Sequence, residues 1–135
     1  MYPCFSQEYI IINPQETTLI PTGIALEVPV EHVAIIFERG SVGKIGLGRR
    51  AGVVDPSYRG EVFVGLTNTS ENPIAISKDP IRTMNQHQDI NKVLEYENAI
   101  AQFILLEYDS PGITETDELS LTERGEQALG HTDKK

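Results

Sequence analysis

Short runs of β-branched and aromatic residues, each closed by a turn residue, constrain the fold of this chain more than any other feature. Four such runs fill residues 8–12, 17–20, 24–28 and 33–37, and none of them shows a convincing helical period. Proline follows each of the first three runs within two residues. Strands that recur at a spacing of about 8–12 residues are typical of β-sandwiches, barrels and jelly rolls. We therefore predict an all-β fold.

Length and composition limit the classes of function. The chain has 135 residues, which corresponds to one domain, and its 39% hydrophobic residues suffice for a core. It has no apolar run of membrane-spanning length and no basic region followed by an apolar stretch at its start, so we expect neither a membrane anchor nor a signal peptide. The net charge of −9 argues against a general nucleic-acid surface. Its single cysteine, Cys4, excludes an intramolecular disulfide and fits a reducing, cytoplasmic compartment.

Residues 38–50 change the character of the chain, because glycines and cations follow directly on the buried-strand pattern of residues 33–37. Glycine allows main-chain N–H groups to approach an anion, and basic or hydroxyl side chains add further donors. Such side chains are present here: Arg39, Ser41, Lys44, Arg49 and Arg50. The segment is neither a Walker A loop nor a dinucleotide fingerprint. It is therefore a phosphate-binding loop or, alternatively, a flexible loop whose cations are solvated.

The stretch 51–62 places one carboxylate between an apolar run and a turn. Val53 and Val54 have the pattern of a buried strand, Pro56 and Ser57 that of a turn, and Asp55 lies between them. Three residues later comes Tyr58, just before a second strand. A strand–turn–strand of this kind suits a carboxylate that positions water beside an aromatic ring that packs on a sugar or base. The alternative is a plain hairpin whose aspartate caps its own turn.

Taken in order, residues 20–24, 39–41 and 51–62 resemble conserved segments of the trimeric dUTPase family, whose relatives are the dCTP deaminases. The last of these segments matches the third motif of the family and carries the strongest resemblance. Residues 99–104 are similar to the fourth motif of that family, and residues 122–125 to the fifth, in its C-terminal arm. The resemblance thus covers nearly the whole chain.

This resemblance implies a β-clip, jelly-roll-like protomer in a homotrimer, with three active sites at the subunit interfaces. The implied reaction converts dUTP and water to dUMP and pyrophosphate, with Mg²⁺ carried by the triphosphate. Asp55 is implied to orient and activate the attacking water, and Tyr58 to pack on the deoxyribose. Phosphate contacts are implied for polar side chains of the other motifs and of a third subunit's arm: Arg39, Ser41, Gln102 and Arg124.

We further expect a β domain over residues 1–109 and a C-terminal arm over 110–135, which is rich in Pro, Gly, Thr and Glu. Residues 77–96 interrupt the path to the fourth motif as a polar insert. In it, Asp79 followed by Pro80 can start a short helix. His87 has no partner at metal-ligand spacing, so we interpret it as a surface histidine.

Departures from the family pattern keep two other functions open. No carboxylate stands in residues 1–3, where the first motif ends, Gly40 replaces a serine, and Leu129 stands where the fifth motif has an aromatic. These changes favour a catalytically impaired, trimeric nucleotide-binding, structural or regulatory protein. A dCTP deaminase is suggested by residues 43–47, but Gly65 stands where that enzyme has its catalytic glutamate. Hydrolysis of dUTP remains the favoured prediction.

Overall fold

The computed structural model describes residues 1–109, 111–123 and 125, and it consists mainly of β-strands. In chain order the elements are β1 (Tyr9–Ile12), β2 (Thr17–Ala25), β3 (His32–Glu38), α1 (Gly40–Lys44), β4 (Leu47–Arg50), β5 (Val53–Val54), β6 (Glu61–Asn68), β7 (Ile74–Ser77), α2 (Pro80–Gln86), β8 (Lys92–Glu95) and β9 (Ala101–Glu107). The prediction of an all-β, jelly-roll-like fold is confirmed.

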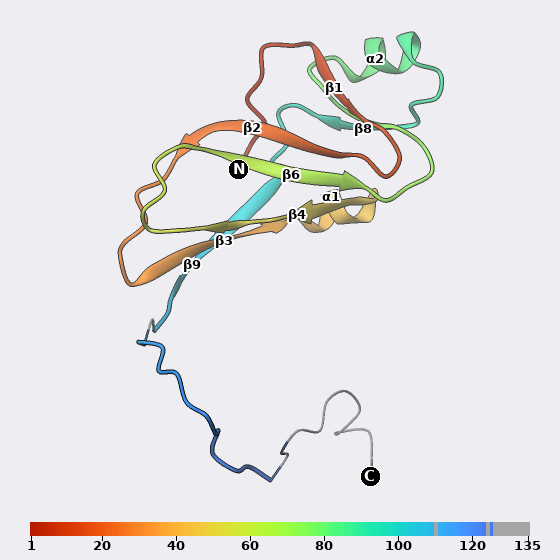
Figure 1. Cartoon of the computed structure of the whole chain (residues 1–135). Helices are drawn as coiled ribbons and strands as arrows, with labels where there is room; N and C mark the ends of the chain where they lie inside the picture. Colours follow the sequence, from red (N-terminus) through yellow and green to blue (C-terminus); the bar gives the residue numbers. More distant parts are fainter. Residues whose placement is uncertain (110, 124, 126–135) are drawn as a thin grey trace.

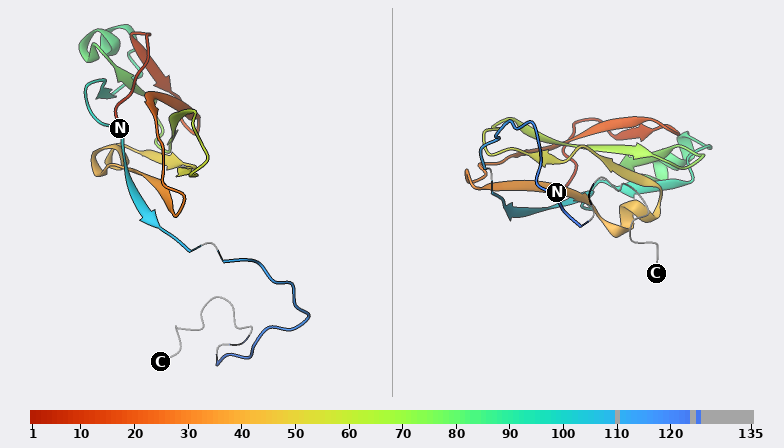
Figure 2. Two further views of the ribbon diagram at one scale, coloured as in Figure 1. Left: turned by 90° about the vertical axis from the view of Figure 1, so that its left-hand side faces the viewer. Right: turned by 60° about the horizontal axis from the view of Figure 1, so that its bottom comes forward.

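The strands form three small sheets, with the orders β1-β7-β8, β2-β6-β4 and β5-β3-β9. The pairs are antiparallel except β7 and β8, which run parallel. Figure 1 shows the second sheet crossing the middle of the body, with β3 and β9 below it. In Figure 1 and in the left view of Figure 2, β1 and α2 lie together at the opposite end.

Burial alternates only at the start of β6, and every residue from Val64 to Asn68 is buried. Val62, Val64 and Leu66 are buried, whereas Phe63 is 44% exposed on the other face of the strand. Residues 61–64 thus show the period-two pattern of a strand with one face in the core, whereas residues 65–68 are all buried. The core that these residues share includes side chains from all three sheets, among them Ile12, Ile20, Ala34, Ile36, Leu47, Ile74 and Ile76.

The Glu61 side chain accepts hydrogen bonds at a place where the pairing of β2 with β6 is irregular. The register shifts between Pro21 and Ala25, which turns the N–H groups of Thr22 and Gly23 away from the ladder. Both N–H groups donate to the Glu61 carboxylate, at 3.1 and 2.8 Å. The Glu61 carboxylate therefore accepts the two N–H groups that the ladder leaves without a carbonyl partner.

The segment predicted as an insert, residues 77–96, adds α2 and β8 to the first sheet. Asp79 caps α2 by accepting a hydrogen bond from the Arg82 N–H at 3.0 Å, with Pro80 at the first turn. The predicted short helix is therefore confirmed. The interpretation of His87 as a surface histidine needs correction, because the ring is partly buried and its Nε2 lies 2.8 Å from the Tyr9 hydroxyl.

Beyond β9, the described part of the C-terminal segment is exposed. Residues 111–123 and 125 are all exposed, and Figures 1 and 2 show this segment leaving the end of β9 and running away from the body. The boundary of the arm at residue 110 stays a prediction. Within the described residues, none of the helices is long and apolar enough to cross a membrane.

Candidate functional site

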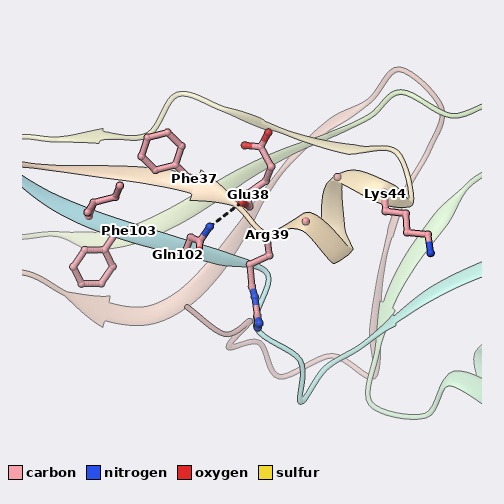
Figure 3. A pocket seen from close by; sticks show the side chains of 9 residues that line it. Phe37, Glu38, Arg39, Lys44, Gln102 and Phe103 are labelled. Carbon is pink, nitrogen blue, oxygen red and sulfur yellow. Dashed lines mark hydrogen bonds between the residues drawn. The ribbon is translucent and has the colours of Figure 1, made fainter.

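An open groove lies at the end of β3, and we call it the Arg39 groove. It has a volume of about 920 Å³ and is lined by Phe37, Glu38, Arg39, Gly40, Gly43, Lys44, Gln102, Phe103 and Ile104. Figure 3 shows the Gln102 amide pointing to the Glu38 carbonyl and the Arg39 side chain extending from the start of α1, at the junction of β3, α1 and β9. The groove thus combines aromatic walls with two cations, one amide and the carboxylate of Glu38.

The register of β3 and β9 explains why Arg39 and Gln102, far apart in the sequence, meet here. Phe37 pairs with Gln102, and Glu38 with Ala101. The amide of Gln102 donates to the Glu38 carbonyl at 3.4 Å, one residue before Arg39. Gln102 on β9 is therefore held beside the end of β3, directly before Arg39, which is the N-cap residue of α1.

Ser41 and Arg124 complete the set of predicted phosphate ligands. Ser41 is exposed on α1 but does not line the Arg39 groove. Lys44, which the sequence placed among the donors of a possible phosphate-binding loop but to which the family resemblance gave no role, lines the groove at the other end of α1. Its signal was the glycine and cation pattern of residues 38–50. Arg124 lies outside the described residues.

The start of the chain runs beside this groove. The Met1 carbonyl accepts the N–H of Ile100 at 2.9 Å, and Pro3 is buried. Burial, and then the positive charge of Arg39, lower the pKa of the Met1 amino group. The start of the chain therefore lies within electrostatic reach of Arg39.

A second, smaller pocket of about 250 Å³ contains Asp55 and Tyr58. We call it the Asp55 pocket; its walls are Ile36, Ala51, Gly52, Val53, Val54, Asp55, Tyr58, Glu61, Val62 and Phe63. The Tyr58 N–H donates to the Asp55 carbonyl at 3.1 Å and closes the turn. The Asp55 side chain is exposed. Because main-chain atoms close the turn, the alternative in which the carboxylate caps it is not supported.

Within one chain the Arg39 groove and the Asp55 pocket are separate, since their linings share no residue. The Ile36 N–H donates to the Gly52 carbonyl at 2.7 Å, so β3 touches both. One chain therefore presents the Arg39 groove at the end of β3 and the Asp55 carboxylate in a separate pocket beside the middle of that strand.

Comparison with known proteins shows the family to which this chain belongs. The family model described as dCTP deaminase-like matches residues 4–86. The deoxyuridine 5'-triphosphate nucleotidohydrolase of Caldanaerobacter subterraneus subsp. tengcongensis is 33% identical over 126 residues, which cover 91% of this chain and 73% of that protein. The chain belongs to the dUTPase and dCTP deaminase-like family. The resemblance stated from the sequence is confirmed.

Solved structures of dUTPases share the fold of this family member. A mutant of the Staphylococcus bacteriophage 80alpha dUTPase with dUpNHpp matches with a TM-score of 0.73 and 21% identity, over 97% of this chain and 84% of that one. A mutant dUTPase from phage phi11 of S. aureus, described for the coordination of a structural Mg(II) ion, matches with a TM-score of 0.63 and 20% identity, over 87% and 82%.

At Gly65 the dUTPase-like chain has neither the carboxylate nor the space that a deaminase glutamate needs. A Cβ atom built there would lie 3.0 Å from the Arg50 carbonyl and 3.4 Å from the Leu19 side chain. Cross-strand pairing sets these neighbours, because Gly65 faces Leu19 on β2 and Arg50 on β4. This geometry argues against deamination by this member of the family.

The described residues of this dUTPase-like chain hold no group of three or more His, Cys, Asp or Glu side chains that could bind a metal ion. Its groove instead offers guanidinium, ammonium and amide donors, which fit phosphate oxygens. Such a donor set suits a triphosphate that brings its own Mg²⁺.

Proposed function

We propose that this protein is a deoxyuridine 5'-triphosphate nucleotidohydrolase, which converts dUTP and water to dUMP and pyrophosphate. The observation that carries the proposal is the exposed Asp55 carboxylate on a turn closed by main-chain atoms, with Tyr58 in the same pocket. The dUTPase with 33% identity over 91% of this chain supports the same activity.

Asp55 acts in this proposal as the general base. It orients a water molecule and accepts its proton while the water oxygen attacks the α-phosphorus. The bond between that phosphorus and the oxygen bridging to the β-phosphate breaks, and the electron pair leaves with pyrophosphate. Tyr58 packs on the deoxyribose. Its position is fixed because its hydroxyl donates to the Glu61 carbonyl at 2.8 Å.

Charge neutralisation is the second requirement of the reaction, since the substrate is Mg²⁺-bound dUTP. Arg39 and Gln102 are placed in one groove and are proposed to bind the phosphates. Ser41, on the adjoining helix, and Arg124, from the arm of a third subunit, are proposed to join them. The donors of the groove need no protein-bound metal for this role.

In this proposal the Arg39 groove and the Asp55 pocket are two half-sites, and a homotrimer brings them together. The Asp55 pocket of one subunit faces the Arg39 groove of a neighbour, so that neither half-site is complete alone. The surface of β9 supports assembly, because Phe103, Ile104, Leu105 and Leu106 are all at least 40% exposed. Four consecutive apolar side chains that are exposed on both faces of a strand are typical of a surface that another protein chain buries. Nucleotide hydrolysis of this kind suits a cytoplasmic protein, with no membrane or nucleic-acid partner.

The test is pyrophosphate release by the purified protein with Mg²⁺ and each of the four common deoxynucleoside triphosphates and dUTP. We expect release from dUTP and loss of release in Asp55→Ala. Absence of release from dUTP, or equal release by the Asp55→Ala variant, would contradict the proposal. A mass measurement that gives a monomer at micromolar concentration would rule out the shared site.

The second candidate is a nucleotide-binding trimer with impaired catalysis. Buried Pro3 favours it, because residues 1–3, where the first motif of the family ends, hold no carboxylate. In the same experiment this candidate predicts that dUTP binds, as measured by calorimetry, while pyrophosphate is not released.

A further inference from the structure

Arg49 joins the two half-sites through contacts on both sides of its guanidinium. On one side Nε lies 3.7 Å from the Glu38 carboxylate, and the guanidinium carbon lies 5.7 Å from the centre of the Phe37 ring. On the other side Nη1 donates to the Ala51 carbonyl. The side chain is 28% exposed, and its Nε is buried without a hydrogen-bond partner among the described residues. Arg49 is therefore packed against protein rather than solvated.

The side that touches Ala51 is the turn that leads to Asp55. Ala51 has φ of 58° and Gly52 has φ of 120°, so both occupy backbone regions that L side chains avoid. A Cβ atom at Gly52 would lie 2.7 Å from the Arg49 Nη1. The guanidinium thus lies directly on this turn, and it occupies the space that a side chain at residue 52 would need.

The other side leads to the Arg39 groove. Glu38 directly precedes Arg39, and its carbonyl accepts the hydrogen bond of the Gln102 amide. Phe37 and Glu38 both line the groove. One guanidinium consequently contacts the strand end that carries Arg39 and the turn that carries Asp55.

We propose that Arg49 is a positioning residue that fixes the Ala51–Gly52 turn against the end of β3, and so sets the place of Asp55. This inference rests on the proposed dUTP hydrolysis for its kinetic consequences. A planar guanidinium can stack, pair with a carboxylate and donate to a carbonyl at the same time, which a lysine ammonium cannot reproduce.

Arg50 provides the matched control, since successive side chains of a strand point to opposite faces. Its Nε donates to the Thr67 hydroxyl at 2.9 Å, away from both half-sites. Arg49→Met and Arg50→Met therefore remove the same charge from neighbouring positions of β4, but only the first removes the contact with the turn.

Kinetics with dUTP give the first test. We expect Arg49→Met to lower kcat on the order of 10- to 100-fold, because small misplacements of a catalytic group are costly, with a smaller change in KM. Arg49→Lys should restore less than half of the loss. Because Arg49 acts through Asp55, adding Arg49→Met to Asp55→Ala should cause no further decrease in kcat. Equal kcat in Arg49→Met and wild type would overturn the inference and leave dUTP hydrolysis standing.

Amide hydrogen exchange gives a test that does not depend on activity. The Ile36 N–H, which donates to Gly52, and the Tyr58 N–H, which donates to Asp55, report on the turn. We expect both amides to exchange about tenfold faster in Arg49→Met and at the wild-type rate in Arg50→Met. Unchanged exchange in Arg49→Met would overturn the inference, including in the case where the wild type fails to hydrolyse dUTP.

Discussion

The hydroxyl of Tyr58 donates to the main-chain carbonyl of Glu61 at 2.8 Å, and this bond folds the ring over Gly60. A Cβ atom on Gly60 would lie 2.6 Å from the Tyr58 hydroxyl oxygen. The glycine is thus required by the position of the ring. The carboxylate of the same Glu61 accepts hydrogen bonds from the N–H groups of Thr22 and Gly23 on β2. Glu61 therefore links the Tyr58 ring to a strand of the β2-β6-β4 sheet.

Gly60→Ala should therefore displace the Tyr58 ring. We expect kcat/KM for dUTP to fall by about tenfold or more, since the ring no longer packs on the sugar in the same place. Steady-state kinetics measure this. Gly48→Ala is the control, because a Cβ atom there meets nothing within 4 Å. If both variants lose the same activity, the position of Tyr58 is not the cause.

Removing the Asn68 side chain should destabilise the fold. Asn68 is fully buried, and its amide donates to the carbonyls of Ile12 and Asn72 at 2.9 and 2.8 Å. Asn68→Ala leaves these acceptors unpaired, so we expect a loss of about 1–3 kcal/mol in the free energy of unfolding. Urea denaturation gives this value. Asn72→Ala, which changes an exposed side chain, should stay within about 0.5 kcal/mol of the wild type.

Acid should weaken the turn between β1 and β2. Hydrogen bonds from the Asn13 main chain and then from its side chain lower the pKa of Glu16. A carboxyl whose pKa is lower in the folded state stabilises the fold above its unfolded pKa of about 4.3, and this stabilisation is lost as the pH falls through the folded value.

Thermal unfolding of wild type and Glu16→Gln between pH 7 and pH 3 measures that loss. We expect the wild type to have the higher Tm at neutral pH and the two curves to converge in acid. Glu71→Gln, at another exposed glutamate, serves as the control. A difference in Tm between wild type and Glu16→Gln that does not change with pH would show that the Asn13 contacts do not act through the charge.

The cap of α2 gives a local prediction. Because the Asp79 carboxylate accepts from the Arg82 N–H, Asp79→Ala should destabilise the helix by about 0.5–2 kcal/mol. Hydrogen exchange of residues 80–86 should rise accordingly, while exchange in β6 stays unchanged. Asp79→Asn, which keeps an acceptor, should recover most of the protection, and its failure to do so would contradict the capping role.

Much of the fold follows from the sequence, because alternating apolar residues and proline-containing turns report directly on strands. The same reasoning found the turn of Asp55 and Tyr58, whose residues are adjacent in the chain. It brought Arg39 and Gln102 together only through a family resemblance, since β-sheet register joins them across distant segments. Strand β8 (Lys92–Glu95) was missed as part of a polar insert, because a short parallel strand with two charged residues has no distinctive pattern. The contacts of Arg49 depend on packing between sheets, which no local pattern encodes.

Because the exposed apolar strand β9 is proposed to be covered in the trimer, the specific activity of the protein should depend on its concentration. If three copies complete each site, the population of active sites depends on the third power of the protomer concentration once the trimer dissociates. Specific activity should then be constant at high concentration and fall steeply on dilution. Thermal stability should fall with it, because burial of Phe103, Ile104, Leu105 and Leu106 contributes to folding only in the assembled state. A dilute solution would thus contain folded protomers that are inactive, because the Arg39 groove and the Asp55 pocket of different subunits are no longer in contact.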